Sequence, residues 1–209
     1  MHQQWFTPEK RTHEGQYVIL RPLDPDTDCT ALYHSGHATV SHLETWRYLP
    51  YGPFKDEKAL YEWLVIQAKS TDPLFHTVID KTTNTPVGII TVMSIVASAG
   101  RAELGHIWYD ARVQRTPVTT ESVYLLLRYM FDELNYRRME WKCDNRNIRS
   151  KNAAQRLGFR YEGLFRKHLI VKSQNRDTAW FSMIDDEWPT QKQRFTEYLA
   201  RPFNRLARG

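Results

Sequence analysis

The chain has 209 residues, of which 41% are hydrophobic and 25% charged; this is ordinary globular usage and argues against disorder. Its two cysteines, Cys29 and Cys143, argue against an extracellular disulfide framework and favour a reducing cytoplasm. The net charge of +5 suits an acidic ligand, either a phosphorylated small molecule or a nucleic acid, without distinguishing the two.

Hydrophobic periodicity predicts a first half with one strand, two helices and then a run of strands. The strand at 87–96 is rich in β-branched residues and nearly continuous, as expected for a central strand covered on both faces. Its apolar stretch is too short to span a bilayer, so no membrane association is expected. In chain order the predicted elements are a strand over 17–23, a helix to about 37, an aromatic-rich loop at 46–54, a helix over 56–69, and strands over 74–80, 87–96 and 102–109.

The second half is predicted to alternate between helices and strands. The helix at 118–134 is the clearest, because its apolar residues fall at helical spacings. The order predicts a mixed α/β or α+β domain with a largely antiparallel sheet and flanking helices. The other elements are a strand over 138–143, a helix over 147–157, a hairpin of strands 159–171 and 178–184 joined by the turn 172–177, and a helix over 191–200.

The turn before the long helix has the features of an anion site. Thr116 is a good N-cap residue, and Pro117 suits the first helical position because its missing N–H would have no partner there. The free N–H groups of Val118, Thr119 and Thr120 and the positive end of the helix dipole would then face an anion. Taken alone, the pattern fits either a phosphate site or an ordinary capped helix.

A second motif carries a family resemblance. Asn147 and Ser150 open a helix as N-x-x-S, and that helix closes in Leu-Gly-Phe at 157–159. Placed after a strand, the turn, a long helix and a strand, this motif resembles the GNAT acetyltransferases, in particular the ribosomal-protein N-terminal-alanine acetyltransferases. The resemblance covers about 17–188: residues 17–22 are similar to the family's first strand, 46–54 to its substrate loop and 161–163 to the start of its final hairpin.

The resemblance implies a single GNAT-type domain over 17–188, between an N-terminal extension (1–16) and a C-terminal helical tail (189–209). Its sheet would splay near Tyr109 and admit acetyl-CoA as the co-substrate, with no metal. The implied reaction is N-acetyl transfer in the cytoplasm, by direct attack of a primary amine on the thioester. The acceptor, a protein N-terminus or a small molecule, is left open, and so is a homodimer.

The resemblance also implies roles for individual residues. Ser150 matches a serine that protonates the departing thiolate, although a helix-start hydroxyl can instead bind its own backbone. Asn147 matches a residue that contacts the cofactor. The remaining implied sites are the backbone of Ile107, Trp108 and Tyr109 for the pantetheine arm, Gln114, Arg115, Val118, Thr119 and Thr120 for the pyrophosphate, and Trp46, Tyr48 and Tyr51 for the substrate.

The turn departs from the family pattern Gln/Arg-x-x-Gly-x-Gly/Ala. Gln114 keeps the first position, but Pro117 replaces the first glycine and removes a donor, and Thr119 adds bulk near the pyrophosphate. We expect Arg115 and the hydroxyls of Thr119 and Thr120 to compensate. The departure also raises an alternative, a non-catalytic protein that binds acyl-CoA.

The general base is less well defined by the sequence. Acyl transfer needs a neutral amine, so a carboxylate or a water chain must accept its proton. Glu103 lies on the strand before the turn and is the predicted base, while Glu121 fits a structural role at the helix start. Glu44 and His168 are further candidates for the general base.

Nucleic acid is the other partner to consider. The basic bias and the stretch from Arg194 to Arg208 leave a nucleic-acid or ribosome-binding module as a second alternative. No RNA-recognition motif is present, so contact with nucleic acid is expected only indirectly, through ribosomal proteins.

Overall fold

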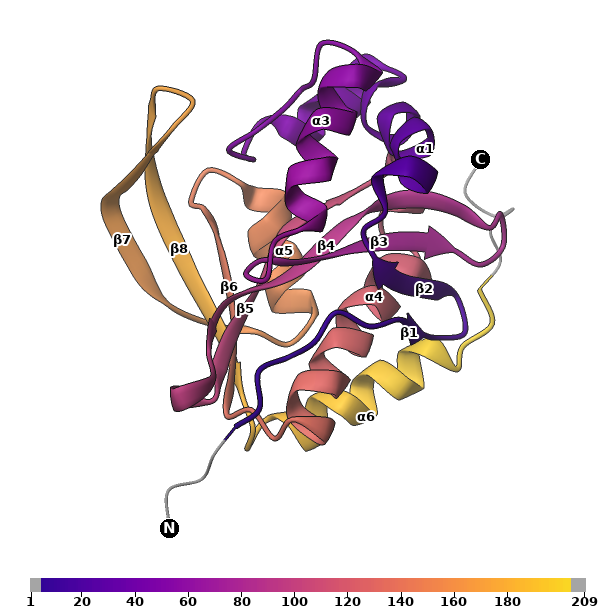
Figure 1. The fold of residues 1–209 in the computed structure, drawn as a ribbon. Helices are drawn as coiled ribbons and strands as arrows, with labels where there is room; N and C mark the ends of the chain where they lie inside the picture. The colour runs from indigo at the N-terminus through magenta and orange to yellow at the C-terminus, as the bar shows by residue number, and fades with distance from the viewer. Residues whose placement is uncertain (1–4, 204–209) are drawn as a thin grey trace.

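An eight-stranded sheet organises the protein in a computed structural model that describes residues 5–203 (Figure 1). The strand order is β1-β2-β3-β4-β5-β6-β8-β7, and β5 with β6 forms the one parallel pair among the described strands. The predicted α+β fold, with a mostly antiparallel sheet and flanking helices, is confirmed.

The strands and helices follow one another in mixed order. The strands are β1 (His13–Glu14), β2 (Val18–Pro22), β3 (Leu74–Asp80), β4 (Thr85–Val96), β5 (Arg101–Tyr109), β6 (Arg138–Asp144), β7 (Arg160–Val171) and β8 (Gln174–Ile184). The helices are α1 (Pro25–His37), α2 (Val40–Leu43), α3 (Glu57–Ala68), α4 (Pro117–Arg128), α5 (Ile148–Arg156) and α6 (Trp188–Leu199), with short 3-10 turns η1 (Glu44–Trp46), η2 (Ala97–Ala99) and η3 (Ala111–Val113) and a π-turn η4 (Tyr129–Glu133).

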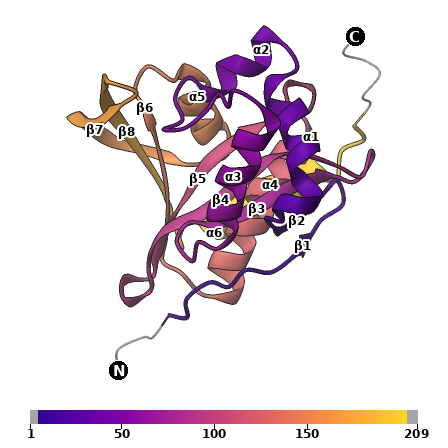
Figure 2. The same cartoon turned by 45° about the horizontal axis from the view of Figure 1, so that its top comes forward.

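The two faces of the sheet carry separate apolar cores. Helices α1 and α3 cover one face, where an aromatic-rich core gathers around Trp46 and Phe75 (Figures 1 and 2). Helices α4 and α6 pack together on the opposite face over the larger core. Among the described residues, no helix is both long and apolar enough to cross a membrane.

Helix α4 starts where the sequence predicts and is buried along its length. Pro117 occupies the first helical position and Thr116 the N-cap, but the Thr116 hydroxyl donates to the Val113 carbonyl at 2.7 Å and does not cap the helix. The first N–H groups of α4 therefore receive no hydrogen bond from the N-cap side chain. The helix continues into the π-turn η4, so the predicted span 118–134 is one continuous segment.

Strands β5 and β6 separate part-way along their length. Their pairing runs from Arg101 opposite Arg138 to Leu104 opposite Trp141 and then stops, although β5 continues to Tyr109. The predicted splaying at this strand is confirmed, and the opening that includes Tyr109 begins at Gly105. The cause is a bulge in β5, where the register against β4 shifts and His106 has a φ of 48°.

The final hairpin turns earlier than the sequence predicts. The turn expected over 172–177 is confined to Lys172 and Ser173, because β8 already begins at Gln174. Both turn residues have positive φ values, 49° and 61°, as in the two-residue turns that match the twist of paired strands. The polar residues 174–177 are instead the exposed and half-buried first residues of β8, which is mostly buried from Thr178 onward. Polarity does not mark a turn where the end of a strand extends into solvent.

Both ends of the described chain pack against the sheet domain. Strand β1, which the sequence analysis did not predict, pairs with β2. Helix α6 begins at Trp188, whose indole Nε1 donates to Asp132 at 2.6 Å. The division into an extension, a domain over 17–188 and a tail stays a prediction.

A buried pair of histidines lies between β1, β3 and η4. His13 and His76 are 4% and 1% exposed, and their ring centroids are 5.6 Å apart. Burial lowers the pKa of His13 to about 4, helped by Arg11 and Arg128, and that of His76 to about 3, helped by His13 and Lys10. Both imidazoles are therefore neutral in the folded protein near pH 7.

Because of this buried histidine pair, we expect the folded protein to lose stability in mild acid. An unfolded histidine binds a proton near pH 6.5, whereas the folded ones do so only near 3 to 4. The unfolded state thus binds more protons below pH 6.5, and the free energy of unfolding should fall by up to about 1.4 kcal/mol per pH unit for each histidine. Urea unfolding of wild type and His76→Phe at pH 7, 6 and 5 measures this slope. We expect the free energy of unfolding to depend less steeply on pH in the variant. Equal slopes in both proteins would show that His76 does not cause the loss of stability in acid.

Candidate active site

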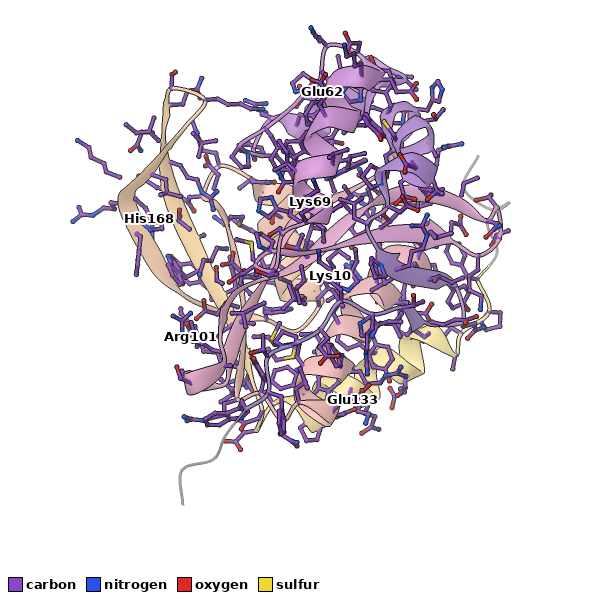
Figure 3. All side chains as sticks on the ribbon, in the orientation of Figure 1. Lys10, Glu62, Lys69, Arg101, Glu133 and His168 are labelled. Atoms are coloured by element: carbon purple, nitrogen blue, oxygen red, sulfur yellow. The ribbon has the colours of Figure 1, made fainter. Side chains whose placement is uncertain are left out.

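A cleft of about 380 Å³ opens where β5 and β6 separate. Its floor is formed by the two strands, and the start of α5 closes one end. The loop after η1 and the β7–β8 hairpin form its sides; His168 lies on β7 (Figure 3). The lining residues are Thr45 from η1, Tyr48, Leu49 and Pro50 from the loop, Met93 from β4, residues 103–107, residues 141–144, Asn147, Ser150, His168, Leu169, Arg176 and Thr178.

The cleft brings together five of the residues predicted for the site. Glu103 and Ile107 come from β5, Asn147 and Ser150 from the start of α5, and Tyr48 from the aromatic loop. The Tyr48 hydroxyl donates to the Arg146 carbonyl at 3.2 Å, so the loop reaches across to the segment before α5. Residues widely separated in the sequence thus share one cavity.

Two of the three aromatic residues predicted to contact substrate lie outside this cleft. Trp46 is fully buried, and its indole N–H donates to the Gly36 carbonyl at 2.8 Å. The Tyr51 hydroxyl lies 3.2 Å from His106 Nδ1, within the aromatic core under α3. The structure gives Trp46 a packing position, because the loop folds back onto α1.

The strand predicted to hold the pantetheine arm has one open edge. Ile107, Trp108 and Tyr109 lie on the part of β5 that no longer pairs with β6, so this edge of their backbone has no strand partner. Their side chains are held by other elements: Trp108 is buried in the aromatic core, and the Tyr109 hydroxyl lies 2.8 Å from Ser122 Oγ on α4. An extended ligand could pair with this edge as a strand does.

The predicted pyrophosphate turn lies at the start of α4 and does not line the cleft. Gln114 Nε2 donates to the Tyr109 carbonyl at 3.2 Å, and Arg115 has a φ of 61°, a region that non-glycine residues rarely adopt. Val118, Thr119 and Thr120 are buried in the first turn.

A basic residue that the sequence analysis did not select reaches the same helix start. The Arg156 guanidinium, on α5, donates to Thr120 Oγ1 at 3.1 Å. It adds a cation beside the first turn of α4, where the helix dipole already favours an anion. No local sequence signal marks this residue, because its contact depends on how α5 packs beside α4.

Ser150 presents a hydroxyl whose acceptor side is occupied. Trp141 Nε1 donates to Ser150 Oγ at 2.9 Å, whereas the Ser150 backbone N–H donates to the Asn147 side-chain oxygen at 3.1 Å. Asn147 is thus the N-cap of α5, and the Ser150 hydroxyl is not used for capping. The hydroxyl is also hydrogen-bonded to the Cys143 thiol, so an acceptor in the cleft would take its proton in place of that sulfur.

The predicted base, Glu103, is part of an ion pair. Its Oε2 accepts from Lys142 Nζ at 2.8 Å and from Ser94 Oγ at 3.2 Å, and Lys142 also contacts Glu140 at 2.8 Å. The Lys142 ammonium lies 4.1 Å from the centroid of the Trp180 ring. A proton acceptor at Glu103 would have to work beside this ammonium group.

His106 is a second group able to accept a proton in the cleft, and the sequence analysis did not select it. Burial lowers its pKa to about 4, so its imidazole is neutral near pH 7. The bulge in β5 places it there. The glycine inside the predicted strand, Gly105, was the available signal, because a glycine in a strand often marks a bulge.

The other candidate bases are a buried carboxylate, an exposed carboxylate and a histidine of the cleft. Glu121 is buried and accepts from the backbone N–H groups of residues 16, 17 and 18, as a structural role requires. Glu44 is exposed and pairs with Arg47 at 3.6 Å. His168 lines the cleft, with its Nδ1 lying 3.0 Å from Thr178 Oγ1.

Cys143 also lines the cleft but is 5% exposed. Burial raises the pKa of its thiol, which leaves it protonated near neutral pH and poorly suited as a nucleophile. Within residues 5–203, no group of three or more histidine, cysteine, aspartate or glutamate side chains is placed to hold a metal ion.

Comparison with known proteins identifies the family. The profile of the Acetyltransferase (GNAT) domain matches residues 18–160. A GCN5-related N-acetyltransferase from Brucella melitensis has a similar structure, with a TM-score of 0.92, 40% identity and coverage of 94% of this chain and 89% of that one. The uncharacterized N-acetyltransferase p20 of Bacillus licheniformis is 31% identical over 82% of this chain and 94% of its own length.

The putative ribosomal N-acetyltransferase YdaF of Bacillus subtilis is 27% identical over 50% of this chain, and the match spans 57% of YdaF. The chain belongs to the GNAT acetyltransferase family. The resemblance drawn from the N-x-x-S motif and the order of elements is therefore confirmed.

Proposed function

We propose that this protein transfers an acetyl group from acetyl-CoA to a primary amine, by direct attack of the amine on the thioester. The observation that carries the proposal is the Ser150 hydroxyl, which lies in the cleft beside the open edge of β5, accepts from Trp141 Nε1 and is hydrogen-bonded to the Cys143 thiol. Membership of the GNAT family supports acetyl-CoA as the donor.

The residues present fit an acyl-CoA. The unpaired edge of β5 at Ile107, Trp108 and Tyr109 offers backbone groups to the amides of the pantetheine arm. The start of α4, without a side-chain cap and with Arg115 and Arg156 beside it, offers N–H groups and positive charge to the pyrophosphate. Bound acetyl-CoA supplies the thioester whose acetyl group is transferred.

Two proton transfers are assigned to residues of the cleft. Glu103 accepts the proton of the attacking amine, directly or through water, and His106 is the second group able to do so. Ser150 donates a proton to the departing thiolate. No covalent enzyme intermediate is proposed, because the buried Cys143 thiol stays protonated.

The acceptor class is a protein N-terminus or a small-molecule amine. The relative YdaF is named a putative ribosomal N-acetyltransferase, and this name supports a protein N-terminus as the acceptor. The alternative of a ribosome-binding module rests on the basic stretch from Arg194 to Arg208, of which residues from 204 onward lie outside the described part of the chain.

Thiol release separates an enzyme from a non-catalytic acyl-CoA-binding protein. The protein is incubated with acetyl-CoA and a panel of primary amines, and free CoA is measured over time against an amine-free control. Amine-dependent release supports the proposal. Calorimetric binding of CoA without release would favour the non-catalytic protein that the Pro117 turn suggests, and no binding at millimolar CoA would reject both.

A further inference from the structure

The β7–β8 hairpin contributes a cation to the cleft that the proposed chemistry does not use. Arg176 lies on β8 opposite Leu169 and lines the cleft with it. The hairpin stands beside β6 on the side of the sheet away from β1 (Figure 1). Arg176 therefore belongs to the wall that an acceptor amine would approach, and not to the turn before α4.

The other charged side chains of the cleft are neutralised by partners. Glu103 pairs with Lys142 at 2.8 Å, and Asp144 pairs with Arg146 at 2.7 Å. Arg176 has no ion-pair partner in the part of the chain that the structure describes. Arg176 also helps to lower the pKa of Asp144, but the close ion-pair partner of Asp144 is Arg146 at 2.7 Å, so Arg176 adds positive charge to this wall of the cleft.

The Arg176 side chain is also held in place. Its Nε donates to Thr178 Oγ1 at 3.1 Å, and the same hydroxyl lies 3.0 Å from His168 Nδ1. Thr178 is fully buried, so it anchors one side of the guanidinium. The two terminal nitrogens have no hydrogen-bond partner within residues 5–203. A guanidinium oriented in this way suits an anion with two oxygens.

We propose that Arg176 binds an anionic oxygen group, a carboxylate or a phosphate, on the amine acceptor. This inference rests on the proposed acetyl transfer and adds a substrate class to it. An acceptor with an anionic group offsets the unpaired charge, whereas a polyamine would add like charge to the same cleft. Arg176 thus determines specificity and takes no part in the proton transfers.

The test compares acceptors that differ in charge and little else. β-Alanine, 4-aminobutyrate and 5-aminopentanoate provide carboxylates on three tether lengths, and their primary amides are the uncharged counterparts. O-phosphoethanolamine provides the phosphate. The measured quantity is kcat/KM from thiol release, for wild type, Arg176→Gln and Arg166→Gln. Arg166 is the matched control, because it is an exposed arginine on the same hairpin that does not line the cleft.

Wild type should prefer an anionic acceptor over its uncharged counterpart by roughly 10- to 100-fold, the range of one charge-assisted contact. Arg176→Gln should abolish this preference by lowering kcat/KM for the anionic acceptors more than for their amides, and Arg166→Gln should retain it. The acceptor that loses most in Arg176→Gln, carboxylate or phosphate, identifies the anion. Equal use of acids and amides by wild type, or a preference that survives in Arg176→Gln, would overturn the inference and leave the proposed acetyl transfer standing.

A binding measurement covers the case in which no amine is acetylated, so that the proposed function itself fails. 4-Aminobutyrate and O-phosphoethanolamine are titrated calorimetrically into wild type and Arg176→Gln, with and without CoA. Binding that weakens about tenfold or more in the variant supports the anion site. Absence of binding, or equal affinity in both proteins, would overturn it.

Discussion

Ser150→Ala is expected to lower the turnover number by about 10²-fold, the low end of general acid catalysis, with acetyl-CoA affinity nearly unchanged. The hydroxyl accepts from Trp141 and is hydrogen-bonded to the Cys143 thiol, and in the proposed reaction its proton goes to the departing thiolate. The cap of α5 uses the Ser150 backbone N–H, which alanine retains. The measurement is steady-state thiol release together with calorimetric titration of CoA.

Two controls separate chemistry from structure. Ser150→Ala leaves the buried Trp141 N–H without its acceptor, a cost of about 1–3 kcal/mol in stability, so folding is checked by thermal unfolding. Trp141→Phe removes the partner but keeps the hydroxyl, and it should lower turnover far less than Ser150→Ala. Unchanged turnover in folded Ser150→Ala would remove Ser150 from the mechanism.

Glu121→Ala is expected to lower the free energy of unfolding by about 3–5 kcal/mol, because three backbone N–H groups lose a charged acceptor at about 1–3 kcal/mol each. The carboxylate accepts from the N–H groups of Gln16, Tyr17 and Val18 at 2.8, 2.6 and 3.0 Å. It joins the start of β2 to the first turns of α4 and is 4% exposed. Alanine would leave these donors without an acceptor, and urea unfolding at pH 7 measures the loss.

The matched control is Glu62→Ala on α3, where the glutamate side chain is 65% exposed and pairs weakly with Lys58. Its effect should stay within about 0.5 kcal/mol. Glu121→Gln keeps one acceptor oxygen, so its loss in the free energy of unfolding should lie between those of Glu121→Ala and Glu62→Ala. A loss below about 1 kcal/mol in Glu121→Ala would mean that water replaces the carboxylate at this junction.

The local features of the site could be predicted because they depend on neighbouring residues. Thr116 and Pro117 mark the start of α4. At the start of α5, the Asn147 side chain accepts a hydrogen bond from the backbone N–H of Ser150. Such capping acts within one helical turn, so the sequence of that turn is sufficient. The same reasoning failed for the Thr116 side chain, which bonds to Val113 because the preceding turn brings that carbonyl closer.

The aromatic loop shows the limit of reasoning from composition. Trp46, Tyr48 and Tyr51 occur close together in the sequence, yet only Tyr48 lines the cleft. The loop folds back onto α1, so that Trp46 fills space beside Gly36 and Tyr51 contacts His106. Which side of a loop faces a cavity depends on packing against distant elements, and the residue types alone do not encode it.

The sequence by itself determined the order of the longer elements, the starts of α4 and α5 and the family, because each depends on contiguous residues, whereas it did not reveal the short β1 and α2. The tertiary structure alone decided where β5 and β6 separate, that Lys142 pairs with Glu103, and that Arg176 lines the cleft without a close ion-pair partner among residues 5–203. The physical reason is separation along the chain. A cap is satisfied within one turn, whereas the charge balance of a cavity depends on side chains brought together from strands and a hairpin that are far apart in the sequence.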